Sequence, residues 1–386
     1  MKIVVAPDSF KDSLSAVQAC EAIERGIRKG IPRADIVKIP LADGGEGTLE
    51  ALVNSTGGTT VSLRVTGPLG NPLNARFGIL GDGDTAVVEM AQASGLMLVP
   101  TADRNPVLTT SYGTGELIRA ALERSSRRII VCIGGSATTD CGTGMAQALG
   151  IRFLRTDGTE ISTPMCGGLM AEAERIDVSG MHPAVPKTKF LVACDVQNPL
   201  LGEKGAVMVY SRQKGADDGQ LALLENNMRH LIGIVEKTVN RSLRDIPGTG
   251  AAGGLAVPLI AFANAELRSG IRLVLEASRF PERIQGADLI LTGEGQVDGQ
   301  TAFGKTIRGV ADEAGRQSIP VVVLAGSIKS GAETLYTHGV VSMFSICSGP
   351  MTLDQAVRNA GPLIEDAAER IIRLYRIHGE GRPTKP

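Results

Sequence analysis

The sequence predicts an α/β protein whose core is a parallel β-sheet covered by helices. Short apolar runs alternate with helical patterns at both ends of the chain, and such alternation is typical of a parallel sheet with helices on both faces. Many of the 48 glycines follow an apolar run and precede a helical pattern, which is where α/β proteins place ligand loops. The length of 386 residues favours two domains.

The first strand–helix unit is clear from its pattern. Residues 2–7 form a buried type of strand, and a polar loop follows at 8–12. A helix is expected from about Ser15, because Ser15 and Gln18 have the S-x-x-Q spacing of a capping box and apolar residues then recur at helical spacing. Pro32 ends this helix, and the next strand is expected at 36–40.

The middle of the chain changes character near residue 59. A glycine-rich turn at 43–48 leads into a helix that runs to about Asn54 and stops at Gly57 and Gly58. Three short strands then follow at 59–65, 73–80 and 85–90, with turn residues between them. The elements expected after these are a helix at 114–123, strands at 128–133, 190–194, 287–292, 319–325 and 340–346, and a long helical pattern at 352–377.

This order of elements predicts a discontinuous domain interrupted by an insertion. We expect residues 1–70 and 285–386 to form one α/β domain from the two ends of the chain. Residues 71–284 would form an inserted second α/β domain. The last residues, from Gly379 on, are polar and are expected to fray.

Composition excludes several kinds of partner. Lys and Arg number 40 against 41 Asp and Glu, without a basic stripe, and aromatic residues are only 3% with no Trp. Nucleic acid and anionic membranes therefore find little to bind. The chain has no secretory signal region and no apolar run of about 18 residues. Its six cysteines are scattered without a C-x-x-C pair, so we expect a cytoplasmic protein in a reducing compartment.

Five clusters of glycines and carboxylates follow predicted strands. Backbone N–H groups at glycines and helix N-termini can hold an anion. One such loop is too weak for a triphosphate, whereas several loops with lysines and Mg²⁺ suit phosphoryl transfer. All five would lie at the carboxyl ends of strands, where open α/β sheets bind ligands. The clusters are residues 8–12, 43–48, 134–144, Asp195, and 293–299 with 304–306.

Each loop also has a purely structural interpretation. A single strand–glycine–helix turn is more often a packing device than a ligand site. Asp43 and Asp140 could act only as helix N-caps, and Asp195 could act only in starting the turn that contains Asn198 and Pro199.

Motifs of other enzyme classes are missing or out of context. Residues 299–306 match the P-loop pattern G-x-x-x-x-G-K-[ST]. A true P-loop starts where its strand ends, but here Glu294 and Asp298 separate the two and would repel phosphates, so we do not assign a P-loop. Lys305 remains a candidate anion ligand at a helix N-terminus. The four histidines lack metal-ligand spacing. A G-x-S-x-G elbow is absent, as is G-x-G-x-x-G after the first strand.

Taken together, five motifs in this order resemble the glycerate kinase family, to which bacterial glycerate 2-kinases belong. They extend over nearly the whole chain, to about residue 375. Cys141 stands where the family pattern leads us to expect glycine. The motifs are residues 6–16 (APDSFKDSLSA), 40–48 (PLADGGEGT), 134–145 (GGSATTDCGTGM), 248–254 (GTGAAGG), and 292–295 (TGEG) with Asp298.

The resemblance implies a Rossmann-like domain, an inserted α/β domain, and an active site in a cleft between them. It also implies ATP as donor, a divalent cation such as Mg²⁺, and glycerate as acceptor. We expect attack by the 2-hydroxyl, which gives 2-phosphoglycerate and ADP.

The resemblance also suggests roles for individual residues. Asp195 would take the proton of the acceptor hydroxyl, with Lys11 and Asp43 as further catalytic residues, and Asp43 with Glu46 would bind the metal. A serine hydroxyl, of Ser9 or Ser13, would contact substrate or phosphate. The expected substrate- and phosphate-binding residues are Asp8, Ser9, Ser13, Gly44, Gly45, Gly134, Gly135, Ser136, Thr138, Gly253, Gly254, Glu294 and Lys305.

Two rival functions stay open at this point. One is a kinase for a different small hydroxy acid. The other is a non-catalytic, ligand-binding regulator with a kinase-like fold, although the Asp and Lys residues kept in the predicted loops argue against a degenerate site. In each case we expect small-molecule ligands and a monomer or homodimer.

Overall fold

The computed structural model describes residues 1–299, 301 and 305–379. These residues confirm the predicted α/β class and form two compact units. Unit 1 comprises Met1–Asp43, Glu50–Thr56 and Ile271–Pro386, and unit 2 comprises Gly44–Leu49 and Gly57–Gly270. Two helices, α2 (Thr48–Thr56) and α9 (Gly270–Ala277), run from one unit into the other.

The boundaries between the two units lie near residues 57 and 271, earlier in the sequence than the expected boundaries near 70 and 284. Residues 57–70 contain β3 (Thr59–Thr66), which pairs along its whole length with β4 (Pro72–Ile79) in the sheet of unit 2. Residues 271–284 contain most of α9 and all of α10 (Phe280–Arg283). In unit 1, Gly309 of α11 (Thr306–Gly315) lies against the Ile271 and Leu275 side chains of α9. Strand pairing and helix packing thus set the division.

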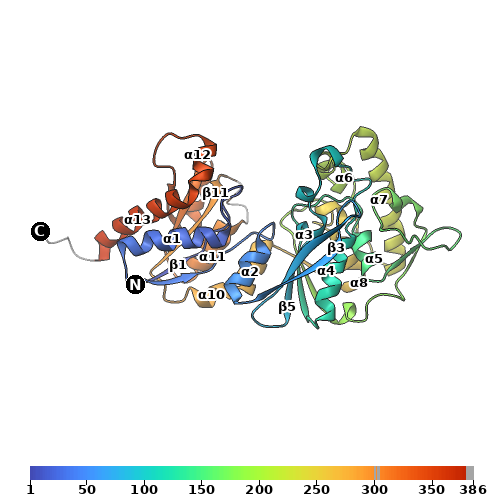
Figure 1. Ribbon diagram of the computed structural model, residues 1–386, viewed down its shortest axis with the longest axis horizontal. Coiled ribbons are helices and arrows are strands. Elements are labelled where there is room, and N and C mark those ends of the chain that lie inside the picture. Colours follow the sequence, from blue (N-terminus) through green and yellow to red (C-terminus); the bar gives the residue numbers. More distant parts are fainter. Residues whose placement is uncertain (300, 302–304, 380–386) are drawn as a thin grey trace, which may run out of the picture. The chain divides into compact units, whose positions relative to one another are not determined.

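Unit 1 is built on a five-stranded sheet in the order β13-β12-β11-β1-β2, and each adjacent pair is parallel (Figure 1). From β1 the chain moves first to one side and later to the other, so β1 and β11 flank the topological switch point of a doubly wound sheet. The strands are β1 (Lys2–Val5), β2 (Asp35–Lys38), β11 (Leu289–Val297), β12 (Val321–Ile328) and β13 (Val340–Ser345).

One face of this sheet is covered by α1 (Ala16–Gly30) and α13 (Ala360–Gly379), which lie side by side in Figure 1. Strand residues such as Ile3 and Val5 share a core with these helices. The intervening Val4 is also fully buried, as expected for a strand covered on both faces. The capping box at Ser15 and Gln18 is confirmed, because each side chain bonds the other residue's backbone N–H.

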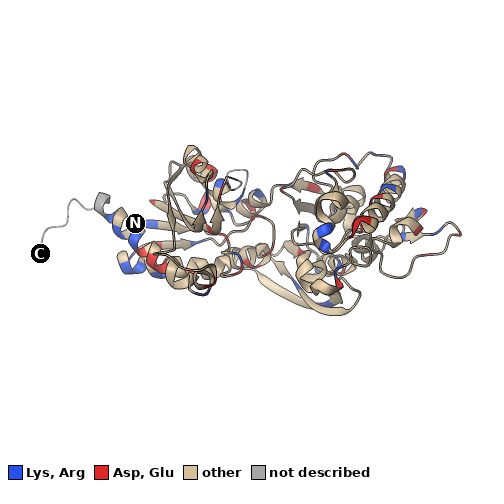
Figure 2. Cartoon of the chain, turned by 90° about the horizontal axis from the view of Figure 1, so that it is seen from above, with Lys and Arg blue, Asp and Glu red and all other residues tan. Residues whose placement is uncertain are grey.

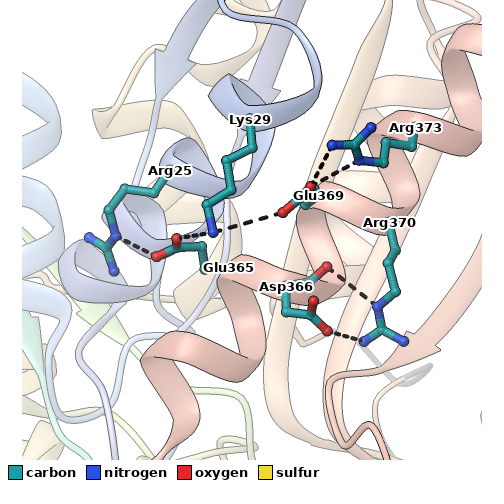
Figure 3. Close-up of polar contacts among 7 residues, drawn as sticks. All are labelled: Arg25, Lys29, Glu365, Asp366, Glu369, Arg370 and Arg373. Atoms are coloured by element: carbon teal, nitrogen blue, oxygen red, sulfur yellow. Dashed lines mark hydrogen bonds and ion pairs between the residues drawn. The ribbon is translucent and has the colours of Figure 1, made fainter.

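Small residues let α1 and α13 approach closely. A Cβ atom on Gly26 would lie 2.2 Å from the Glu365 carbonyl oxygen and 2.7 Å from Ala368 Cβ. Ion pairs lie along the same contact. The Glu365 carboxylate pairs with Arg25 at 2.8 Å and with Lys29 at 2.6 Å (Figure 3). Such exposed pairs contribute at most about 1 kcal/mol each, so helix packing decides the stability of this contact.

The long helix expected at 352–377 is two helices in the structure. α12 (Leu353–Arg358) ends before Asn359, and α13 begins at Ala360. Pro362 explains the break, because a proline ring clashes with the carbonyl four residues earlier, here that of Arg358. A Thr352–Gln355 capping box starts α12.

Unit 2 contains a six-stranded sheet in the order β10-β9-β6-β5-β4-β3. The expected three-strand segment is confirmed as the antiparallel β3, β4 and β5 (Thr85–Glu89). The next three strands, β6 (Arg128–Cys132), β9 (Lys189–Ala193) and β10 (Glu266–Arg268), continue the sheet in parallel. A two-stranded sheet pairs β7 (Arg152–Leu154) with β8 (Arg175–Asp177).

Helices of unit 2 share one large apolar core with its six-stranded sheet. Acidic and basic positions are present on both units (Figure 2). No helix among the described residues is long and apolar enough to cross a membrane. The helices of unit 2 are α3 (Ala91–Ser94), α4 (Tyr112–Glu123), α5 (Thr143–Ala148), α6 (Ala206–Tyr210), α7 (Asp218–Val239) and α8 (Ala256–Ala263).

The approach of α1 and α13 predicts the effect of adding one methyl group. Gly26→Ala should lower the free energy of unfolding by about 1–3 kcal/mol, because the new Cβ must push the two helices apart. Urea unfolding of the purified protein measures this change. Gly233→Ala is the matched control, since nothing lies within 4 Å of the added Cβ in α7. It should stabilise the protein by up to about 1 kcal/mol, and equal effects of the two substitutions would contradict the packing argument.

Candidate active site

Carboxylates gather at the switch point of the unit 1 sheet. Beyond the carboxyl end of β1, the Asp8 N–H donates to the Gly293 carbonyl of β11 at 2.8 Å. Glu294 follows in β11, and Asp43 lies close enough to Asp8 and Glu294 for charge repulsion. We call Asp8, Asp43 and Glu294 the acidic cluster. Parallel pairing of β1 with β11 thus joins residues that are nearly three hundred positions apart.

Two members of the acidic cluster, Asp8 and Glu294, have raised pKa values. Burial raises the pKa of Asp8 to about 6, and the Asp43 charge adds to the shift. Burial also raises the pKa of Glu294 to about 7, with further contributions from Asp8 and Asp43. A hydrogen bond from Thr301 Oγ1 at 2.8 Å and the charge of Lys305 oppose the shift at Glu294. The cluster would therefore gain from a cation that binds between its oxygens.

The loop after β1 is held by its own polar groups. The Ser9 N–H donates to the Asp8 carboxylate at 2.6 Å, and Phe10 and Leu14 exchange backbone hydrogen bonds across a tight turn. Lys11 is exposed in this turn. The Ser13 hydroxyl donates to the Val357 carbonyl at 2.7 Å. Of the two serines, Ser13 therefore anchors the loop to α12, and its expected role as a ligand contact stays a prediction.

The P-loop match does not form a phosphate cradle in the part that the structure describes. Thr306 begins α11, and its hydroxyl donates to the Asp8 carboxylate. A carboxylate therefore occupies the N-terminal end of this helix, where a P-loop would hold phosphate. Lys305 is exposed at the N-cap position beside Glu294. Residues 300 and 302–304 of the motif lie outside the described residues.

In unit 2 the backbone loops approach one another through glycines. A Cβ on Gly44 would lie 2.8 Å from both Ala193 Cβ and Gly270 Cα, and one on Gly134 would lie 3.0 Å from Gly45 Cα. The Gly270 N–H donates to both Asp195 oxygens, at 3.1 and 3.2 Å. We call Gly44, Gly45, Gly134 and Gly270 the glycine cluster. It brings together the carboxyl ends of β6, β9 and β10, with Asp195 exposed beside Gly270.

The first residues of the loop after β6 are the accessible ones. Gly135 is exposed with a φ of +73°, Gly134 is half-buried, and Ser136 is 9% exposed. Neither the Gly134 nor the Gly135 N–H donates a hydrogen bond to another described residue. These two donors can therefore serve an anion, as predicted for a glycine loop.

Thr138 of the same loop, and two glycines that pack against this loop, are buried, so their expected contact with a ligand stays a prediction. Thr138 is fully buried. Gly253 and Gly254 are buried too, and a Cβ on Gly253 would lie 2.2 Å from the Thr138 carbonyl oxygen. Asp140 is fully buried and accepts hydrogen bonds from Ser111, Gly142 and Gly144. These residues shape the loop from inside unit 2.

The expected metal pair of Asp43 and Glu46 is divided between the units. Asp43 has Asp8 and Glu294 as acidic neighbours in unit 1, whereas exposed Glu46 lies near Glu89 in unit 2. Among the described residues, no group of three or more His, Cys, Asp or Glu side chains is arranged to hold a metal by itself. Carboxylate oxygens are nevertheless the donors that Mg²⁺ prefers, and Mg²⁺ usually binds through one or two of them plus phosphate and water.

Sequence reasoning missed Glu89, a buried carboxylate at the end of β5. It is 2% exposed and accepts the Leu49 N–H of α2 at 2.6 Å. Burial raises its pKa. Its position after a run of buried strand residues was the available signal, because a charged residue there needs a partner. Glu89 fixes the first turn of α2, which directly follows the loop of Gly44 and Gly45.

Comparison with known proteins finds relatives that match almost the full length. The family model described as "Glycerate kinase family" matches residues 3–376. A glycerate kinase of Bacillus subtilis (strain 168) is 50% identical over 377 residues, which cover 98% of each chain. A glycerate 2-kinase of Escherichia coli (strain K12) is 46% identical, again over 98% of each chain. The crystal structure of a protein assigned as glycerate kinase 2 from Salmonella typhimurium LT2 has a TM-score of 0.89 and 43% identity, and the match covers 98% of this chain and 99% of that one.

The raised pKa of Glu294 predicts a pH-dependent penalty in the metal-free protein. Between its ordinary pKa of 4.5 and its folded pKa of about 7, the unfolded chain loses this proton first, so stability falls as pH rises. Glu294→Gln should therefore stabilise the protein at pH 8 by up to about 3 kcal/mol, with the gain vanishing near pH 4.5. Denaturant unfolding of both proteins at several pH values, with EDTA to remove metal ions, measures this difference in the free energy of unfolding.

Glu236→Gln provides a control of opposite sign. Partly buried Glu236 has a pKa lowered to about 2, mainly by Arg244 and backbone N–H groups that outweigh its burial. Its ionised form therefore stabilises the fold above pH 4.5, and that contribution is lost as pH falls through about 2. The substitution should destabilise the protein at pH 8. A gain at pH 8 in Glu236→Gln, or none in Glu294→Gln, would contradict these assignments.

Proposed function

The chain belongs to the glycerate kinase family and is a kinase, and we propose that it transfers the γ-phosphoryl group of ATP to the 2-hydroxyl of glycerate. The products would be 2-phosphoglycerate and ADP. The choice of the 2-hydroxyl rests on the Escherichia coli relative, which is named glycerate 2-kinase. Because ATP is a cytoplasmic metabolite, the proposal places the enzyme in the cytoplasm.

The observation that carries the proposal is the acidic cluster at the switch point of unit 1. Phosphoryl transfer requires little covalent chemistry from the protein, but it requires charge neutralisation and positioning. Three carboxylates that repel each other, with Lys305 beside them, supply groups for a metal–phosphate complex. The accessible N–H groups of Gly134 and Gly135 in unit 2 supply uncharged anion donors.

Oxygen donors of the acidic cluster fit Mg²⁺. We propose that one or two carboxylates of this cluster (Asp8, Asp43 and Glu294) hold this ion together with phosphate and water, in place of the pair Asp43 and Glu46. The bound ion would neutralise phosphate charge during transfer. Ionisation of Asp8 and Glu294 is favoured when their mutual repulsion is relieved.

Asp195 is proposed as the group that orients the acceptor hydroxyl and takes its proton. It is exposed at the carboxyl end of β9, and the Gly270 N–H holds its carboxylate in one orientation. A general base needs such a fixed position within hydrogen-bond reach of its proton. Lys11, exposed in the turn at 10–14, is proposed to contact the anionic substrate.

The product of the reaction tests the proposed function. Purified protein with ATP, Mg²⁺ and D-glycerate should give ADP and 2-phosphoglycerate in equal amounts, identified by phosphorus NMR. Formation of 3-phosphoglycerate would overturn the proposed regiochemistry. A panel of longer hydroxy acids tests the first rival, a kinase for another acceptor. Absence of acceptor-dependent ADP formation with every acid would favour the second rival, a ligand-binding regulator.

Replacement of the proposed base should affect turnover more than folding. Asp195→Asn should lower kcat by about 10²-fold or more, while the amide oxygen still accepts the Gly270 N–H. Steady-state kinetics measures the loss, and thermal unfolding checks that the fold is kept. Near-normal turnover in a folded Asp195→Asn variant would remove Asp195 from the mechanism.

A further inference from the structure

Lys214 is a fully buried lysine that no step of the proposed reaction uses. It ends the 3₁₀ turn Arg212–Lys214 and is only 2% exposed. Its Nζ atom donates to the Thr138 carbonyl oxygen at 2.6 Å. Burial of an ammonium group is costly unless hydrogen bonds and an opposite charge compensate it. A lysine in this position therefore needs an explanation.

The compensating charge belongs to the loop after β6 itself. Asp140 is fully buried and close enough to Lys214 to act on its pKa. Burial lowers the pKa of Lys214 to about 7, and Asp140 opposes this shift. The Asp140 carboxylate also accepts the Ser111 hydroxyl at 2.6 Å and the Gly142 N–H at 3.1 Å. Lys214 and Asp140 thus hold two points of one loop from inside unit 2.

The same loop contains a buried side-chain oxygen that has no hydrogen-bond partner in unit 2. Thr138 Oγ1 is buried, and it has no hydrogen-bond partner among the described residues. The neighbouring carbonyl of Thr138 points to Lys214. In a trans peptide the following N–H points the opposite way, so the lysine fixes the orientation of the Thr138–Thr139 peptide. The accessible end of the loop, Gly134 and Gly135, has N–H groups without an acceptor among the residues that the structure describes.

We propose that Lys214 is a positioning residue, which holds residues 134–139 in the conformation that receives an anionic group of the ligand. The group is either the carboxylate of glycerate or a phosphate of ATP, and this choice rests on the proposed function. Lys214 acts through the Thr138 carbonyl and does not touch the ligand.

Two substitutions separate the hydrogen bond from the charge. Lys214→Gln keeps a donor for the Thr138 carbonyl but removes the charge, and Lys214→Met removes both. Thr188→Val is the matched control. The Thr188 hydroxyl is a buried donor to the Ala184 carbonyl at 2.9 Å, and it precedes β9 at the other end of the same sheet. It therefore reports the loss of a buried hydrogen bond away from the loop.

Steady-state kinetics with D-glycerate and with ATP varied separately gives the main readout. In Lys214→Met, KM for the ligand seated in the loop should rise about tenfold or more, as expected for a lost network of charged hydrogen bonds. The KM for the other substrate and kcat should change less. In Lys214→Gln, the KM for the ligand seated in the loop should lie between the values for Lys214→Met and the wild-type protein. Thr188→Val should lower the unfolding temperature without changing either KM.

Thermal shift gives a second readout that does not need turnover. D-glycerate and sodium tripolyphosphate are tested separately. At least one of them should raise the unfolding temperature of the wild-type protein, and Lys214→Met should lose that increase. If wild type phosphorylates no glycerate, the proposed function fails, but this measurement still tests Lys214. Folded Lys214 variants with wild-type KM values and thermal shifts would overturn the proposal. Failure of both variants to fold would also overturn it, because Lys214 would then serve the core.

Discussion

Parallel pairing around β1 is the constraint on which the unit 1 site depends. Register Ile3↔Leu289 sets β1 against β11, and Ile3↔Ile36 sets it against β2. Because all three strands run in one direction, the segments after them emerge at the same edge. Carboxylates from three distant parts of the sequence then share one low-dielectric region, and repulsion there follows from the strand order. The same plan recurs in unit 2, where β6, β9 and β10 deliver the glycine cluster.

Local signals explain why most of the fold was predictable. The first helix begins at its capping box, and the three-strand segment after residue 59 has its turns at Gly, Pro and Asn. The longest helix in the described part of the chain, α7, was nevertheless not predicted, although Asp217 and Gln220 form a capping box at its start. The break at Asn359 was also missed, because the apolar spacing continues across it while Pro362 ends the hydrogen-bond ladder.

Side-chain partners at the site were harder to predict, because they depend on contacts distant in sequence. Nothing near Ser13 indicates that its hydroxyl meets the Val357 carbonyl. Thr138 belongs to a glycine-rich motif, yet the chain folds it inward against Gly253. Conversely, the motifs did place Asp8 after its strand, whereas Glu294, expected after a strand at 287–292, lies within the longer β11. A motif therefore predicts which loop reaches a sheet edge, whereas tertiary packing decides which of its atoms remain accessible.

The backbone contacts of the glycine cluster leave no room for a side chain at two of its positions, Gly44 and Gly134. Gly44, Gly45, Gly134 and Gly270 meet through main-chain atoms or Ala193, so even alanine at Gly44 or Gly134 would force the loops apart. Neighbouring surface residues face no such limit. A homologous chain that keeps the overall architecture but has lost either glycine has therefore given up the seating of these loops. Glycine at these two positions is therefore a condition for the close approach of the loops in any chain with this architecture.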